Sequence, residues 1–111
     1  MKIAERIQKL NAERGRLNRQ VGLNFEFRVL RKYKNDSRVA FTHRSQGSFG
    51  PVDVLVQFKD KRQYLISCKN NGYWHPKELT KLQKLKECLN EYQQIKRAFY
   101  VSPKKWVLRD L

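Results

Sequence analysis

An aspartate and a lysine stand on two neighbouring apolar stretches of the chain, where an unpaired charge is costly. Asp53 lies inside the apolar run at residues 52–56, and Lys69 closes the run at residues 64–68. Charged groups in such surroundings point to a functional site. A carboxylate that binds a divalent cation, with a lysine nearby, suits the hydrolysis of a phosphodiester. The two residues therefore predict a metal-dependent nuclease site.

Glu26 is a candidate for a second carboxylate. It follows Phe25 on the first predicted helix, so it can reach from the helix towards the sheet. Each residue has a structural explanation when taken alone: Asp53 as the cap of a turn, Lys69 as a solvated strand end, and Glu26 as a residue of the helix surface. The prediction of a site rests on their combination.

The first thirty residues predict the helix that carries Glu26. Apolar residues recur at steps of three and four from Ile3 to Leu30, which predicts one long helix or two helices broken near Gly15. The spacing also resembles heptads, but Arg14 occupies one seam position and a coiled coil needs a longer run. Packing against the domain is the favoured interpretation, and dimerisation through this arm is the lesser alternative.

The rest of the chain predicts strands around one further helix. Asp53 and Lys69 fall on a hairpin whose turn is at residues 60–62, and a second helix runs from Pro76 to about Tyr92. Runs rich in β-branched and aromatic residues predict strands at residues 39–43, 52–58, 64–69, 98–101 and 106–108. This order predicts an α/β fold with a central mixed five-stranded sheet flanked by helices.

The charge of the chain predicts its partner. Lys and Arg number 25 against 10 Asp and Glu, which gives a net charge of +15. Such self-repulsion favours a nucleic acid as partner, with an acidic protein, a membrane surface or a merely solvated surface as alternatives. We predict a cytoplasmic protein without a membrane span and with reduced thiols at Cys68 and Cys88. A zinc site formed by these cysteines with His43 and His75 is disfavoured because close paired spacing is missing.

Four short motifs occur in an order that resembles a known family. They are Gly-Leu-Asn-Phe-Glu at residues 22–26, Arg-Ser-Gln-Gly-Ser at 44–48, Val-Asp at 52–53 and Tyr-Leu-Ile-Ser-Cys-Lys at 64–69. From about Val21 onwards the chain resembles the archaeal Holliday junction resolvases of the PD-(D/E)XK nuclease superfamily. The resemblance implies an N-terminal helical extension at residues 1–20 and a nuclease-like domain at residues 21–111.

The resemblance also implies a function. It implies a restriction-endonuclease-like homodimer that binds four-way DNA junctions in recombination and repair, near the nucleoid, and cuts two strands with Mg²⁺ or Mn²⁺. By position, Glu26 and Asp53 would bind the metal, and Lys69 would position or activate the attacking water. The phosphate-binding loop would contain Arg44, Ser45 and Ser48. Backbone amides, hydroxyls and a guanidinium are all suited to phosphate contacts.

One position departs from the family pattern. The family carries an acid two residues before the lysine, and this chain carries Ser67. A hydroxyl is a poorer Mg²⁺ ligand than a carboxylate. By analogy with a branch of restriction endonucleases, Glu78 on the following helix is the first substitute, and Glu87 is too far along. Glu78 has a second interpretation as an N-terminal helix residue stabilised by the helix dipole.

Two functions therefore remain open. One is a structure-selective endonuclease for branched DNA, in which Ser67 belongs to the catalytic set. The other is a catalytically weak or inactive junction-binding protein of the same fold. A sequence-specific restriction enzyme ranks lower because the chain offers little room for a base-reading subdomain, and nothing in the sequence decides against RNA.

Three residues after the predicted site offer further contacts. Tyr73 and Trp74 are suited either to stacking on unpaired bases or to packing in a dimer interface. His75 is a candidate general base, although a structural role is the favoured interpretation.

Overall fold

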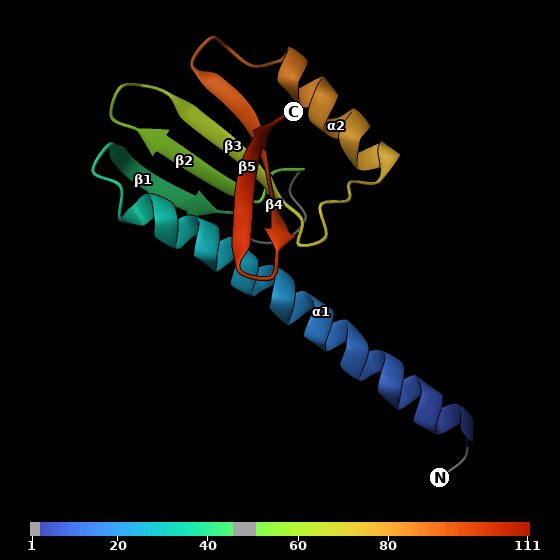
Figure 1. The fold of residues 1–111 in the computed structure, drawn as a ribbon. Helices are drawn as coiled ribbons and strands as arrows, with labels where there is room; N and C mark the ends of the chain where they lie inside the picture. Colours follow the sequence, from blue (N-terminus) through green and yellow to red (C-terminus); the bar gives the residue numbers. More distant parts are fainter. Residues whose placement is uncertain (1–2, 46–50) are drawn as a thin grey trace.

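The structure is a computed structural model that describes residues 3–45 and 51–111 (Figure 1). Two helices and five strands follow one another as α1 (Ile3–Lys34), β1 (Val39–Arg44), β2 (Val54–Phe58), β3 (Gln63–Cys68), α2 (Pro76–Glu87), β4 (Gln93–Ser102) and β5 (Lys105–Asp110).

The five strands form one mixed sheet in the order β1-β2-β3-β4-β5. The pairs β1–β2, β2–β3 and β4–β5 are antiparallel, whereas β3 and β4 are parallel. The parallel pair requires a crossover, and α2 supplies it. The predicted α/β fold with a mixed five-stranded sheet and packed helices is confirmed.

One hydrophobic core lies between α1 and the sheet. The second half of α1 presents apolar residues at steps of three and four, so they lie on one helix face. That face packs on alternate residues of the strands, which point to the same side of the sheet. The buried members are Phe25, Val29, Leu30, Tyr33, Val54, Val56, Phe58, Ile66 and Ala98.

A second, smaller core lies under α2. Trp74, Leu82 and Ile95 are buried there, and Leu65 of β3 packs against them. Leu65 alternates with Ile66 of the first core, so β3 contributes to both sides of the sheet. The strand that precedes Lys69 is therefore held between two cores.

The first half of α1 corrects one prediction. The helix is unbroken at Gly15, and its early apolar residues do not pack on the domain: the exposed fractions of Ile3, Leu10, Leu17 and Val21 are between 52% and 77%. Figure 1 gives the reason, because this half of α1 projects beyond the sheet. No helix in the described part of the chain is both long enough and apolar enough to cross a membrane.

The C-terminal half differs from prediction in its boundaries. Helix α2 ends at Glu87 rather than near Tyr92. The side chain of Asn90 accepts a hydrogen bond from the Tyr92 backbone N–H at 2.9 Å, and this local turn replaces further helix. Strands β4 and β5 are longer than predicted, because partners on one or both sides satisfy the backbone even where the side chains are polar.

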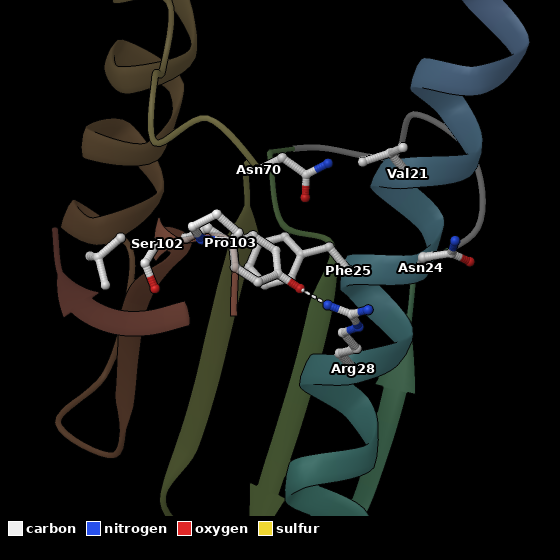
Figure 2. Close-up of a pocket in the computed structure, with 9 residues that line it drawn as sticks. Val21, Asn24, Phe25, Arg28, Asn70, Ser102 and Pro103 are labelled. Atoms are coloured by element: carbon white, nitrogen blue, oxygen red, sulfur yellow. Dashed lines mark hydrogen bonds between the residues drawn. The ribbon is translucent and has the colours of Figure 1, made fainter. Parts of the chain in front are cut away.

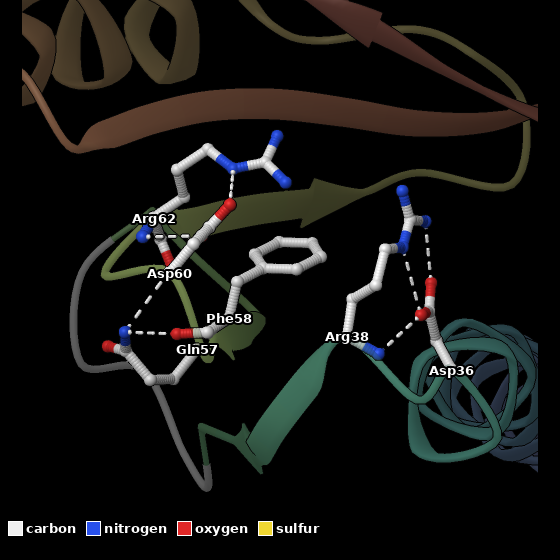
Figure 3. Close-up of polar contacts among 6 residues, drawn as sticks. All are labelled: Asp36, Arg38, Gln57, Phe58, Asp60 and Arg62. Carbon is white, nitrogen blue, oxygen red and sulfur yellow. Dashed lines mark hydrogen bonds and ion pairs between the residues drawn. The ribbon is translucent and has the colours of Figure 1, made fainter.

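Two aspartate–arginine turns lie next to each other at the same end of the β1–β2 pair (Figure 3). Asp36 accepts three hydrogen bonds from Arg38 between α1 and β1, and these bonds lower the pKa of Asp36 to about 2. Asp60 accepts two hydrogen bonds from Arg62 in the turn between β2 and β3. The second turn sets the register in which β3 returns along β2.

The β2–β3 turn contains one strained residue. Lys61 has a φ of 79°, in the left-handed region that favours glycine. We expect Lys61→Gly to raise the free energy of unfolding by roughly 0.5 kcal/mol, because relief of strain exceeds the added chain entropy. Urea unfolding checks this, with Lys59→Gly as the matched control that lowers stability. Equal losses in both variants would contradict it.

Candidate active site

Asp53 is fixed by the two strands that it joins. It stands just before β2, and its backbone N–H donates to the Ile66 carbonyl at 2.9 Å. Its Oδ2 accepts the backbone N–H of Cys68 at 2.8 Å, while its carbonyl accepts the N–H of Ser45 at 2.8 Å. The carboxylate therefore has a set orientation against the end of β3.

The pKa of Asp53 reflects its neighbours. Burial raises the pKa, the Cys68 N–H and the charge of Lys69 lower it, and the charge of Glu78 raises it. The net direction is upward. Asp53 thus lies within electrostatic reach of both Lys69 and Glu78, as a reactive site would require.

Glu26 approaches the same place from α1. Burial raises the pKa of its carboxyl group, and the charge of Asp53 raises it further. Arg44 opposes this shift through a contact of 3.4 Å between its Nη1 and Oε2 of Glu26. Both carboxylates also raise the pKa of the Cys68 thiol, after burial, which is the larger cause. Two acids from different elements thus lie within electrostatic reach of each other.

Lys69 forms an ion pair with Glu78. Its Nζ lies 2.6 Å from Oε2 of Glu78, and both side chains are partly exposed. Lys69 lowers the pKa of Glu78. Glu78 also accepts the backbone N–H of His75 at 3.4 Å as the third residue of α2, in a capping box. The interpretation of Glu78 as an N-terminal helix residue is supported, and its role as a substitute acid stays a prediction, for which the structure adds its ion pair with Lys69.

His75 has a structural role in this arrangement. It is the N-cap of α2, and its Nδ1 accepts the backbone N–H of Lys77 at 3.1 Å. That nitrogen is the one that would otherwise take up a proton as a base. The structural interpretation of His75 is supported.

Ser67 occupies the position where the family pattern has an acid. Its side chain is 3% exposed, and its Oγ accepts the indole N–H of Trp74 at 2.8 Å. Trp74 is itself 4% exposed, because its side chain is buried against α2. The predictions that Trp74 stacks on bases or packs in a dimer interface were both wrong. Tyr73, its neighbour, is 62% exposed.

Arg97 is a residue that the sequence did not single out. It is the partner of Ser67 across the β3–β4 ladder, and its guanidinium carbon lies 5.4 Å from the centre of the Trp74 ring. Its Nε is buried without a hydrogen-bond partner among the described residues. Only the register of the parallel pair brings Arg97 here, and no local motif announces it.

The predicted phosphate-binding loop is described in part. Arg44 is bound to Glu26 and lies 5.0 Å from the centre of the Phe27 ring. Ser45 is half-buried and donates its backbone N–H to Asp53. Ser48 lies outside the described residues. Arg44 thus contacts Glu26, and its predicted contact with phosphate stays a prediction.

Glu26 and Asp53 are the carboxylates of this site that could hold a divalent cation. Within residues 3–45 and 51–111 there is no cluster of three or more acidic, histidine or cysteine side chains suited to a metal. Mg²⁺ commonly needs only one or two carboxylates and keeps waters or phosphate oxygens for its other positions. Glu26 and Asp53, which repel each other in its absence, meet that smaller requirement.

No family model, curated protein or solved structure matches the chain. We therefore infer the function from the geometry around Asp53.

The raised pKa of Asp53 predicts an effect of this residue on stability. Because folding raises its pKa from 3.8, the folded chain binds this proton more tightly than the unfolded chain. The stability contributed by the protonated form is lost as the pH rises through that raised pKa. We expect Asp53→Asn, which keeps an acceptor for the Cys68 N–H, to unfold at a higher urea concentration than the parent at pH 7 and at an equal one near pH 3.

The control is Asp60→Asn in the exposed turn. Arg62 lowers the pKa of Asp60, so this variant loses stability at neutral pH instead. A lower urea midpoint for Asp53→Asn than for the parent at pH 7 would contradict the raised pKa.

The Ser67–Trp74 contact predicts a second stability effect. Ser67→Ala leaves the buried indole N–H without an acceptor, which costs about 1–3 kcal/mol. Thermal unfolding followed by the fluorescence of tryptophan checks this. Ser102→Ala, at an exposed position, is the control and leaves the midpoint nearly unchanged. A loss no greater than that of the control would remove the structural role of Ser67.

Proposed function

We propose that this chain is a metal-dependent, structure-selective DNA endonuclease with a restriction-endonuclease-like fold of the PD-(D/E)XK kind. One observation carries the proposal: the Asp53 carboxylate accepts the backbone N–H of Cys68, directly before Lys69, and Glu26 of α1 lies within its electrostatic reach. Two acids and a lysine at one end of a hairpin are the groups that phosphodiester hydrolysis uses.

In this proposal each group has a distinct role. Glu26 and Asp53 would hold Mg²⁺ or Mn²⁺, which would supply charge to offset that of the phosphate and lower the pKa of water. Lys69, held by Glu78, places a cation beside the phosphate and orients the attacking water. Asp53 stays aimed at this point because its Oδ2 is bound to the Cys68 N–H.

Glu78 takes the place of the acid missing at Ser67. The hydroxyl of Ser67 is committed to Trp74, so it is not aimed at the carboxylate pair. Glu78 is the only acid of α2 that pairs with Lys69 in the described residues, and its charge acts on Asp53. A carboxylate that enters from the helix restores the third acid without using β3.

The substrate proposed is branched DNA, with the four-way junction first. The charge of +15 supports a polyanionic partner, because phosphate contacts dominate the affinity of DNA-binding proteins. Symmetric cutting of a junction requires two sites, so a homodimer belongs to the proposal.

The cleavage test uses labelled four-way junctions with Mg²⁺ or Mn²⁺. We expect cleavage by the parent, and a loss of about 100-fold or more in Asp53→Asn and Lys69→Met, since each removes a group that acts on the reacting phosphate. Asp60→Asn and Lys59→Met, both in the exposed turn after β2, are the matched controls and retain activity. Equal cleavage by Asp53→Asn and the parent would rule out the assignment.

Glu78 is tested separately. Glu78→Gln keeps an acceptor for the His75 N–H, so the helix cap survives, but it loses the charge next to Lys69. We expect cleavage to fall by about 10-fold to 100-fold with the melting temperature nearly unchanged. Glu87→Gln at the end of α2 is the control. Unchanged cleavage in Glu78→Gln would leave the capping role alone.

A second function is favoured by one observation. The charge of Lys69 is already paired with that of Glu78. Ser67, which stands where the family pattern has an acid, is hydrogen-bonded to Trp74. Both features fit a site that binds DNA without cutting it. This alternative predicts junction binding that weakens steeply with salt and yields no products. Ser67→Glu is its sharpest probe, because restored cleavage in that variant, absent from the parent, would establish the binding-only function.

A further inference from the structure

A cavity of about 520 Å³ lies beside the candidate active site, between α1 and the β4–β5 hairpin (Figure 2). Its walls combine aromatic or apolar surfaces with amide and guanidinium groups. They come from Val21, Asn24, Phe25, Arg28, Asn70, Tyr100, Val101, Ser102 and Pro103. The space is ample for one planar heterocycle.

Asn70 gives the cavity an unused acceptor. Its Oδ1 is buried and has no hydrogen-bond partner among the described residues. Buried polar atoms are nearly always paired, so this unpaired acceptor is a candidate contact for a ligand. Figure 2 shows the amide of Asn70 facing the space between α1 and the hairpin.

Arg28 sets the charge of the cavity. Its Nη1 donates a hydrogen bond to the Tyr100 hydroxyl, and its guanidinium carbon lies 5.9 Å from the centre of that ring (Figure 2). This cross-link holds α1 to the hairpin and places a positive charge at the wall. A cationic occupant is disfavoured, and one attached to a phosphate is favoured.

Two adjacent pairs of residues connect the cavity with the candidate site. Phe25 lines the cavity, and the next residue, Glu26, is one of the paired acids. Asn70 lines the cavity, and the preceding residue, Lys69, pairs with Glu78. A nucleic acid strand whose phosphate lies at Lys69 therefore has a neighbouring nucleotide within reach of the cavity.

We propose that this cavity receives one unstacked nucleobase of the DNA strand at the candidate site, with adenine preferred. The inference rests on the proposed function, because the strand must lie along Lys69. An asparagine amide pairs with the amino group and ring nitrogen of adenine, and Tyr100 and Pro103 supply the surface against which a base packs. Branched DNA offers such unpaired bases where duplex DNA does not.

Binding of single strands tests the proposal without cleavage. The probes are fluorescein-labelled (dA)₁₂ and an abasic 12-mer with the same phosphates, titrated with the intact protein at fixed salt without a divalent cation. We expect (dA)₁₂ to bind about 5-fold to 10-fold more tightly, the range of one base contact. Asn70→Ala removes the acceptor, and Ser102→Trp fills the cavity. Each variant should abolish the difference in affinity between the two strands.

Controls separate the cavity from general affinity. Asn35→Ala, an exposed amide at the end of α1, should keep the preference for (dA)₁₂, and unchanged melting temperatures exclude unfolding. Equal affinities of the parent for the two strands overturn the proposal, even if junctions are cut normally. If the parent protein neither binds nor cuts junctions, the proposed function is overturned. The proposal that the cavity receives a base of DNA is then overturned with it. If adenosine monophosphate binds as tightly as (dA)₁₂, the cavity is a site for a free nucleotide, and the proposal of a DNA base is also overturned.

Discussion

The hydrogen bond from the Cys68 amide to the Asp53 carboxylate is the contact on which the candidate site depends. Asp53 extends the β2–β3 ladder with its own N–H and then replaces a backbone acceptor with its side chain. The same residue therefore ends a strand pair and presents a buried acid. This dual use orients the carboxylate, but it also desolvates it, which raises its pKa and leaves a charge that a cation would stabilise.

Several elements converge on that fixed acid. Helix α1 brings Glu26 because its apolar face must cover the sheet, and β3 ends with Lys69 between two cores. Helix α2 starts with a capping box whose glutamate turns towards the lysine. Helix capping, strand pairing and core packing thus place these charged groups. Glu26, Asp53 and Glu78 lie near Lys69 although the chain as a whole is strongly basic.

The sequence predicted those parts that follow from local pattern. The hairpin next to Asp53 and Lys69 and the mixed sheet were visible in apolar runs and turn residues, whereas the capping role of His75 was not. The contact of Trp74 with Ser67 could not be predicted, because the sequence does not show whether a tryptophan is buried with a hydrogen-bond partner or exposed. The exposed half of α1 was misjudged because periodicity shows a face and not what covers it. Arg97 and the cavity at Asn70 depend on long-range register.

The most direct test is a ¹³C NMR titration of the Glu26 and Asp53 carboxyl groups with and without Mg²⁺. Coupled, buried acids that form a cation site should both titrate above their ordinary pKa values in the metal-free protein, and Mg²⁺ should lower both pKa values together. Ordinary pKa values for both groups, unchanged by Mg²⁺, would contradict the account.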